Sequence, residues 1–221
     1  MECNAKIVIV DDHSLFREGM KLLIEKEGIG EVIAEAENGE VFLDLMERLK
    51  PGPDLILMDI DMPIMDGLEA TIKAKAHWPD LKILVLTMYS DKENYTGMIH
   101  AGAIGFVQKT SGKKELEKAI KTVIGGECYF SNELLRQIII NSKRQHSFPE
   151  NSQGVDIDFT DRELAVLQYF CKGLTTTEIA SKLFRSVKTI EAHRSKLLEK
   201  TNSKNTINLI LFAIKNKLVD I

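Results

Sequence analysis

Residues 55–67 read LILMDIDMPIMDG, an apolar run of four residues that ends abruptly in Asp59. Two other runs, KIVIV at 6–10 and ILVL at 83–86, also end in polar residues. Apolar runs of this length, without polar alternation, are typical of strands that are buried on both faces of a parallel sheet. The three runs therefore predict the central strands of such a sheet.

Weaker strand patterns lie at 32–34 and 105–107, and helical patterns occupy the intervals. The expected helices span 14–27, 40–49, 67–77, 93–101 and 113–125. Strands that alternate with helices predict an α/β fold, a five-stranded doubly wound parallel sheet with helices on both faces. In such a sheet the functional site lies at the carboxyl ends of the strands.

Five polar residues follow these strand ends: Asp11, Asp12, Asp59, Thr87 and Lys109. Clustered aspartates repel one another and become tolerable beside a hard divalent cation, for which Mg²⁺ is the natural candidate. An aspartate held near Mg²⁺ and an ammonium group can attack a phosphoryl group, and the threonine can donate a hydrogen bond to it. Taken singly, each residue is as well explained as a solvated loop residue. All five residues at the matching strand ends together favour a site.

The chain of 221 residues carries 33 acids and 29 bases, unevenly distributed. Residues 1–125 have a net charge of −7, residues 126–155 are neutral, and residues 156–221 carry +3. An acidic front and a basic back predict two domains with different partners. Three widely spaced cysteines form no CxxC pair, and no apolar run is long enough to span a bilayer. We therefore expect a cytoplasmic protein without a disulfide framework or membrane contact.

The predicted division is a domain at 1–125, a linker at 126–154 and a helical domain at 155–221. Within the linker, NELLRQIIIN at 132–141 predicts a short amphipathic helix, and the polar stretch 142–154 predicts a flexible tether.

The back of the chain carries clear helix signals. TDRE at 160–163 and TTTE at 175–178 are capping boxes, and Ser186 is an expected N-cap for a helix at 187–200. A fourth helix is expected at 206–217. Two short helices joined by a tight turn, the second polar on its outer face, predict an all-α four-helix domain containing a helix-turn-helix. The expected apolar side of the third helix carries Val187, Ile190, Leu197 and Leu198.

The front domain resembles a response-regulator receiver domain, with the flavodoxin-like strand order 2-1-3-4-5. The resemblance rests on IVIVDDH (7–13), LILMDIDMPIMDG (55–67), VLT (85–87) and GAIGFVQK (102–109). It implies that Asp59 is the phospho-acceptor and that Thr87 and Lys109 are the switch hydroxyl and the counter-charge. The implied Mg²⁺ ligands are Asp11, Asp12, Asp59 and the backbone carbonyl of Asp61.

Phe106 stands where this family has a switch aromatic, often tyrosine. A phenyl ring can still move between buried and exposed rotamers but has no hydroxyl to hold either. A plain core role for Phe106 is the alternative.

The stretch 160–205 resembles the LuxR-type helix-turn-helix, most specifically in EIA (178–180), SVKT (186–189) and E-x-H-R (191–194). The resemblance implies that the outer helix enters the major groove of DNA. Phosphate contacts are expected from Lys188, Thr189, His193, Arg194 and Lys196. Base-edge contacts are expected from Glu191, Ala192 and Ser195. Asp161, Asn202 and Thr206 depart from the common family residues.

The whole chain thus resembles a NarL/FixJ-type response regulator, a DNA-binding regulator rather than an enzyme. The implied partners are a histidine kinase as phosphodonor, double-stranded DNA and a second copy of the chain. Three other classes stay open from the residues: an aspartyl-nucleophile hydrolase, a phosphorylation-independent regulator with a scaffolding receiver, and an adaptor that binds protein through its helical domain.

Overall fold

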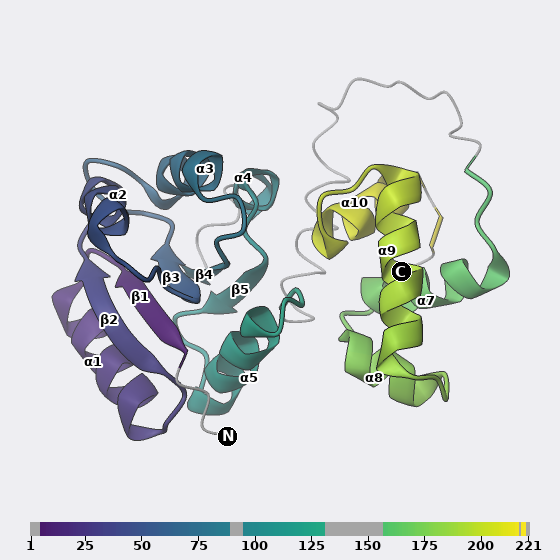
Figure 1. Ribbon diagram of the computed structural model, residues 1–221, viewed down its shortest axis with the longest axis horizontal. Coiled ribbons are helices and arrows are strands. Elements are labelled where there is room, and N and C mark those ends of the chain that lie inside the picture. Colours follow the sequence, from purple (N-terminus) through teal and green to yellow (C-terminus); the bar gives the residue numbers. More distant parts are fainter. Residues whose placement is uncertain (1–4, 89–94, 131–156, 217, 220–221) are drawn as a thin grey trace. The chain divides into compact units, whose positions relative to one another are not determined.

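A computed structural model describes residues 5–88, 95–130, 157–216 and 218–219 (Figure 1). The chain forms two compact units, Met1–Tyr129 and Phe130–Ile221, which are described separately below. The helix expected at 132–141 and the tether expected at 142–154 lie outside the described residues.

The first unit is built on a five-stranded parallel sheet in the order β2-β1-β3-β4-β5. The predicted fold and strand order are confirmed. The strands are β1 Lys6–Val10, β2 Glu31–Ala36, β3 Leu55–Asp59, β4 Ile83–Thr87 and β5 Gly105–Gln108. Every residue of the central strands β3 and β4 is buried, whereas the edge strand β2 is only partly buried. This difference explains why the sequence pattern of β2 was the weaker signal.

Helices cover both faces of the sheet (Figure 1). Helices α1 (Ser14–Lys26) and α5 (Lys113–Ile124) pack on one face, where they enclose a core that includes Ile24 and Ile120. Helices α2 (Gly39–Arg48), α3 (Gly67–His77) and α4 (Tyr95–Ala101) lie together on the other face.

A close backbone approach fixes the loop between β3 and α3. A Cβ atom on Gly67 would lie 2.0 Å from the carbonyl oxygen of Asp59, and the Gly67 amide donates to the Ile60 carbonyl at 2.8 Å. Only glycine permits this contact. The same loop holds Ile64 at φ 69°, a left-handed conformation that is unusual for a β-branched residue.

Beyond α5 the chain returns along the edge of β5. The Phe106 amide donates to the Tyr129 carbonyl at 2.8 Å, and the Tyr129 amide donates to the Ile104 carbonyl at 3.1 Å. The segment that leaves the first unit is therefore hydrogen-bonded directly to the strand that carries Phe106.

The second unit contains the four predicted helices, α7 (Asp161–Cys171), α8 (Thr176–Lys182), α9 (Val187–Thr201) and α10 (Thr206–Lys215). Both predicted capping boxes are present, Thr160 with Glu163 and Thr175 with Glu178, and the Ser186 side chain caps α9. Asn202 ends α9 in the left-handed conformation, at φ 50°. Among all described residues, no helix is long and apolar enough to cross a membrane.

The expected apolar side of α9 is only partly covered. Ile190 and Leu197 are buried, whereas Val187 is 38% exposed. Side chains on a helix lean toward its N-terminus, so the first residue of α9 points beyond the packed part of the helix.

Burial also decides the state of Cys171. It is buried as expected, and the low-polarity surroundings raise the pKa of its thiol to about 12, which keeps it protonated and unreactive.

Candidate functional site

The carboxyl ends of the strands bring the predicted pocket residues together. Asp11 directly follows β1, Asp59 ends β3, and Thr87 ends β4. The Lys109 amide donates to the Thr87 carbonyl at 2.8 Å, so the lysine follows β5 at the same edge. Asp11, Asp59 and Thr87 are buried. Asp11, Asp59 and Lys109 thus meet in one buried cluster, and Thr87 ends the neighbouring strand at the same edge of the sheet.

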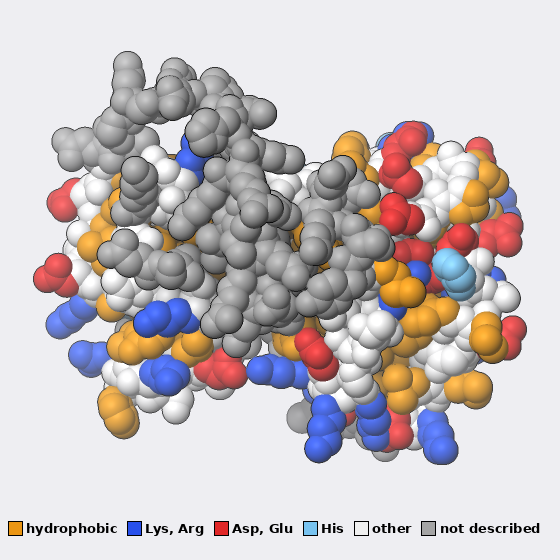
Figure 2. Space-filling model, turned by 180° about the vertical axis from the view of Figure 1, so that it is seen from behind, with side chains coloured by type: hydrophobic (Ala, Val, Ile, Leu, Met, Phe, Trp, Pro, Cys, Tyr) orange, Lys and Arg blue, Asp and Glu red, His pale blue; other side chains and the backbone are white. Residues whose placement is uncertain are grey.

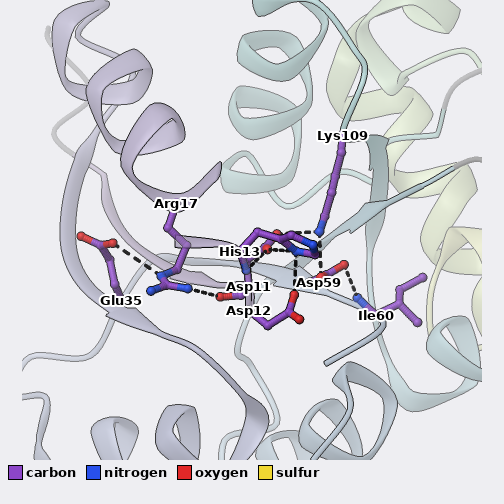
Figure 3. A network of polar contacts seen from close by, with 8 residues as sticks. All are labelled: Asp11, Asp12, His13, Arg17, Glu35, Asp59, Ile60 and Lys109. Atoms are coloured by element: carbon purple, nitrogen blue, oxygen red, sulfur yellow. Dashed lines mark hydrogen bonds and ion pairs between the residues drawn. The ribbon is translucent and has the colours of Figure 1, made fainter. Parts of the chain in front are cut away.

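Lys109 is the centre of this pocket (Figure 3). Its ammonium nitrogen lies 2.7 Å from Asp11 Oδ2 and 2.7 Å from Asp59 Oδ2. The other oxygen of Asp59, Oδ1, accepts a hydrogen bond from the Ile60 amide at 2.8 Å. The ring of Phe16 lies under the ammonium, 5.1 Å from Nζ to the ring centroid. The Asp59 carboxylate is therefore held through both of its oxygens.

The pocket perturbs both partners of this pair. Burial raises the pKa of Asp59, the nearby Asp11 raises it further, and the hydrogen bond from Lys109 opposes the rise, so that the pKa is about 6. Burial lowers the pKa of Lys109, but its hydrogen bonds to the two aspartates outweigh this effect and raise the pKa. Lys109 is therefore charged at neutral pH, and Asp59 is an ionised carboxylate above about pH 6.

A group of candidate metal ligands adjoins this pair. One ligand atom from each of Asp11, Asp12, His13 and Asp59 lies within 4.8 Å of the others. Three carboxylates this close repel one another, and a hard divalent cation, which prefers oxygen ligands, would offset their negative charge. His13 was not predicted as part of this group. Its Nδ1 lies 2.7 Å from Asp12 Oδ1 and 3.2 Å from Asp11 Oδ1. Asp61 is exposed, two residues beyond β3.

Arg17 is a second residue that sequence reasoning missed. Its Nη1 donates to the backbone carbonyl of Asp11 at 2.6 Å, and its Nε lies 3.8 Å from Glu35 Oε2 (Figure 3). Glu35 also pairs with Lys21 at 3.1 Å. These contacts tie the acidic loop to α1 and β2. A basic residue one helical turn into α1 was the only available signal.

The expected switch residues contact a third side chain. Phe106 is fully buried and packs edge to face against Tyr95, with 5.7 Å between ring centroids. The Thr87 hydroxyl lies 2.9 Å from the Met88 carbonyl oxygen, to which it donates, and 3.2 Å from the Tyr95 hydroxyl. Tyr95 was absent from the sequence-based predictions because it belongs to none of the motifs.

Helix α9 presents most of the predicted DNA-binding residues on one exposed stripe. Lys188, Glu191, Ala192, Ser195 and Lys196 follow the spacing of one helix face, and all five are exposed. The other three, Thr189, His193 and Arg194, are half-buried at its margins. The Thr189 amide also donates to the capping hydroxyl of Ser186 at 3.1 Å. Figure 2 shows basic side chains gathered around the end of the second unit where α8 lies in Figure 1.

Two family models match the chain. Residues 7–121 match the response regulator receiver domain, and residues 158–213 match the luxR family of bacterial regulatory proteins. The first match agrees with the acidic pocket at the strand ends, and the second agrees with the four-helix unit.

Curated relatives span nearly the whole chain. The oxygen regulatory protein NreC of Staphylococcus epidermidis is 36% identical over 220 residues, which cover 97% of this chain and 99% of NreC. The transcriptional regulatory protein YhcZ of Bacillus subtilis, itself uncharacterized, is 38% identical over 213 residues, which cover 96% and 97%.

A solved structure of RcsB from Salmonella enterica serovar Typhimurium, bound to the rprA promoter with the phosphomimetic BeF3⁻, is also similar. It is 25% identical, covers 95% of this chain and 98% of its own, and has a TM-score of 0.54. Fold, pocket and relatives together define a two-component signalling protein with a receiver and a DNA-binding domain. The chain belongs to the NarL/FixJ family of response regulators. It is therefore a regulator of transcription, and the hydrolase and adaptor classes are excluded.

Proposed function

We propose that Asp59 accepts a phosphoryl group from a histidine kinase and that this modification controls DNA binding by α9. The observation that carries the proposal is the buried triad of Asp11, Asp59 and Lys109, in which one ammonium lies 2.7 Å from both carboxylates. A carboxylate with this partner is ionised at neutral pH yet remains poorly solvated, which suits a nucleophile.

The transfer forms one bond and breaks one. A carboxylate oxygen of Asp59 attacks the phosphorus, the P–N bond to the donor histidine breaks, and the electron pair stays on the imidazole nitrogen. Lys109 offsets charge on the phosphoryl oxygens, and Thr87 donates to one of them. Asp11, Asp12, Asp59 and the Asp61 carbonyl would hold Mg²⁺, which supplies further charge stabilisation when bound.

DNA is the proposed partner of the second unit. Lys188 and Lys196, with Thr189, His193 and Arg194 at the margins, contact phosphates, which sets the position of the helix. Glu191, Ala192 and Ser195 face base edges from the centre of the stripe. A single helix reads few bases, so we propose that two copies bind two half-sites. RcsB gives a precedent, because one of its structures contains two dimers bound to two parallel DNAs.

The proposed division of labour follows the charge distribution. The acidic receiver at 1–125 takes the signal, residues 126–154 transmit it, and the basic domain at 155–221 reads DNA. We therefore propose a cytoplasmic location, where both the phosphohistidine of a kinase and DNA are accessible.

The acceptor is tested by labelling the full chain with acetyl phosphate and Mg²⁺ and resolving the phosphorylated form on a phosphate-affinity gel. The wild type should take up one phosphoryl group, and Asp59→Asn none. Asp44→Asn, which changes an exposed aspartate on α2, should label like the wild type. Removing Mg²⁺ with a chelator should abolish labelling.

Labelling of Asp59→Asn at the wild-type level would refute the acceptor assignment. Absence of labelling in all three proteins, with Mg²⁺ present, would favour the phosphorylation-independent regulator instead.

A further inference from the structure

Tyr95, the first residue of α4, links the two proposed switch residues. Its side chain is buried, with 1% of the residue exposed. Its hydroxyl lies 3.2 Å from Thr87 Oγ1 and 3.4 Å from the Met88 carbonyl oxygen, to which it donates. Its ring packs edge to face on Phe106 at an interplanar angle of 87°. One side chain therefore contacts the hydroxyl on β4 and the aromatic ring on β5.

The hydroxyl of Thr87 has a single proton to donate. In this structure it donates to the Met88 carbonyl oxygen at 2.9 Å. A hydrogen bond to a phosphoryl oxygen on Asp59 requires the same proton, so Thr87 must turn away from Met88 when Asp59 is phosphorylated. Tyr95 already donates to that carbonyl and remains as its donor after the turn.

We propose that Tyr95 is a positioning residue for Thr87. When Thr87 turns toward a phosphoryl group on Asp59, Tyr95 becomes the donor to the Met88 carbonyl oxygen. The resulting shift of the Tyr95 ring moves Phe106, against which it packs. This inference rests on the proposed phosphorylation of Asp59. The distance of 3.4 Å is long for an O–H···O hydrogen bond, whose usual length is about 2.7–2.8 Å. The bond can therefore tighten once Thr87 has left, drawing the start of α4 inward.

The arrangement explains how a phenylalanine can serve at position 106. Phe106 has no hydroxyl of its own, and the hydroxyl comes from α4 instead. Because the two rings are packed together in the core, a shift of Tyr95 cannot leave Phe106 unaffected.

The test is a double-mutant cycle on beryllofluoride affinity. The full chain, Tyr95→Phe, Thr87→Ala and the double variant are titrated with beryllofluoride and Mg²⁺ and followed by fluorine NMR. Tyr95→Phe should bind about three- to tenfold more weakly, because the hydrogen bond that supports the turned Thr87 is lost. In the Thr87→Ala background the same change should have almost no effect, since there is no hydroxyl to turn. Tyr169→Phe removes a phenol from the second unit and should bind like the wild type.

Each result supports or overturns the inference. Tyr95→Phe binding as tightly as the wild type, or more tightly, would overturn it. Weakening by the same factor in both backgrounds would show a purely structural role and overturn it as well. A wild type that binds no beryllofluoride would instead refute the proposed phosphorylation of Asp59.

A second measurement avoids any folding defect of Tyr95→Phe. The four tyrosines of the chain are replaced by 3-fluorotyrosine, and the Tyr95 resonance is identified with the other single Tyr→Phe variants. Beryllofluoride should shift this resonance in the labelled protein that retains Thr87, and it should not shift the resonance in the labelled Thr87→Ala variant. If the resonance does not shift in the labelled protein that retains Thr87, the inference is overturned.

Discussion

Ile64, in the loop that follows the proposed acceptor Asp59, has a strained backbone conformation. Its backbone is left-handed at φ 69°, and its side chain is 77% exposed. The isoleucine thus gains little from burial and adopts a conformation that disfavours β-branched residues.

Replacing Ile64 by glycine should stabilise the receiver. A non-glycine residue in the left-handed region costs roughly 1–2 kcal/mol, and the extra freedom of glycine in the unfolded chain offsets part of the gain, so about 1 kcal/mol is expected. Urea unfolding measures the difference. The matched control is Ile72→Gly in α3, where isoleucine is 54% exposed in a regular helix and glycine should destabilise instead. If Ile64→Gly and Ile72→Gly change the free energy of unfolding by the same amount and in the same direction, the left-handed φ of Ile64 does not destabilise the protein.

Between elements, an ion pair between the buried Glu163 and the partly exposed Lys200 ties α7 to α9, the helix that we propose reads DNA. Lys200 lies 2.7 Å from Glu163 Oε2 and also donates to the Asp158 carbonyl at 2.8 Å. Glu163 additionally accepts from the Thr160 amide in the capping box. Burial raises the pKa of Glu163, but the hydrogen bonds from Lys200 and Thr160 outweigh it and lower the pKa to about 2.

This lowered pKa predicts a loss of stability in acid. An ordinary glutamate titrates at 4.5, so the ionised Glu163 stabilises the fold fully above that pH. The contribution is lost as the pH falls from about 4.5 toward 2. Glu163→Gln should cost about 1–3 kcal/mol at pH 7 and should flatten the pH dependence below 4.5. Glu178→Gln, an exposed residue at the same position of the other capping box, should have a smaller effect. Unfolding of the second unit by circular dichroism between pH 2 and 7 measures both.

Over the whole molecule, opposite net charges separate the two tasks. The receiver side is acidic and holds the triad, whereas the basic side carries the exposed stripe on α9. A modification can act by shifting the populations of existing states, so the proposed phosphoryl group on Asp59 need only change the fraction of chains that are competent to bind DNA.

DNA binding should therefore depend on both salt and the pocket. Affinity for the selected site should fall steeply with salt concentration, and Lys188→Ala should lower the logarithmic slope by about one for each half-site. Beryllofluoride should raise the affinity of the wild type and leave Asp59→Asn unchanged. Fluorescence anisotropy over a salt series measures these effects, with Lys172→Ala, outside the α9 stripe, as the control. If Lys188→Ala has the same dependence of log affinity on log salt concentration as the wild type, Lys188 does not contact a phosphate.

The helices and strands and the residue types of the pocket could be predicted from local patterns in the chain. Buried apolar runs mark strands through local burial, capping boxes mark helix starts through local hydrogen bonds, and the strand ends specify Asp11, Asp59, Thr87 and Lys109. These signals are local along the chain, or they follow from the rule that parallel strands share one carboxyl edge. Periodicity placed Val187 on the apolar side of α9, but it does not show that the first residue of the helix is left 38% exposed.

The residues that support this pocket and α9, the helix that we propose reads DNA, emerge only from the packing of separate elements. Arg17 reaches the Asp11 carbonyl, Tyr95 meets Thr87 and Phe106, and Glu163 pairs with Lys200 across 37 positions of the chain. None of these contacts follows from a motif or a period. Each depends on the distance and orientation between separate elements, which packing fixes to a few tenths of an ångström and which no local pattern encodes.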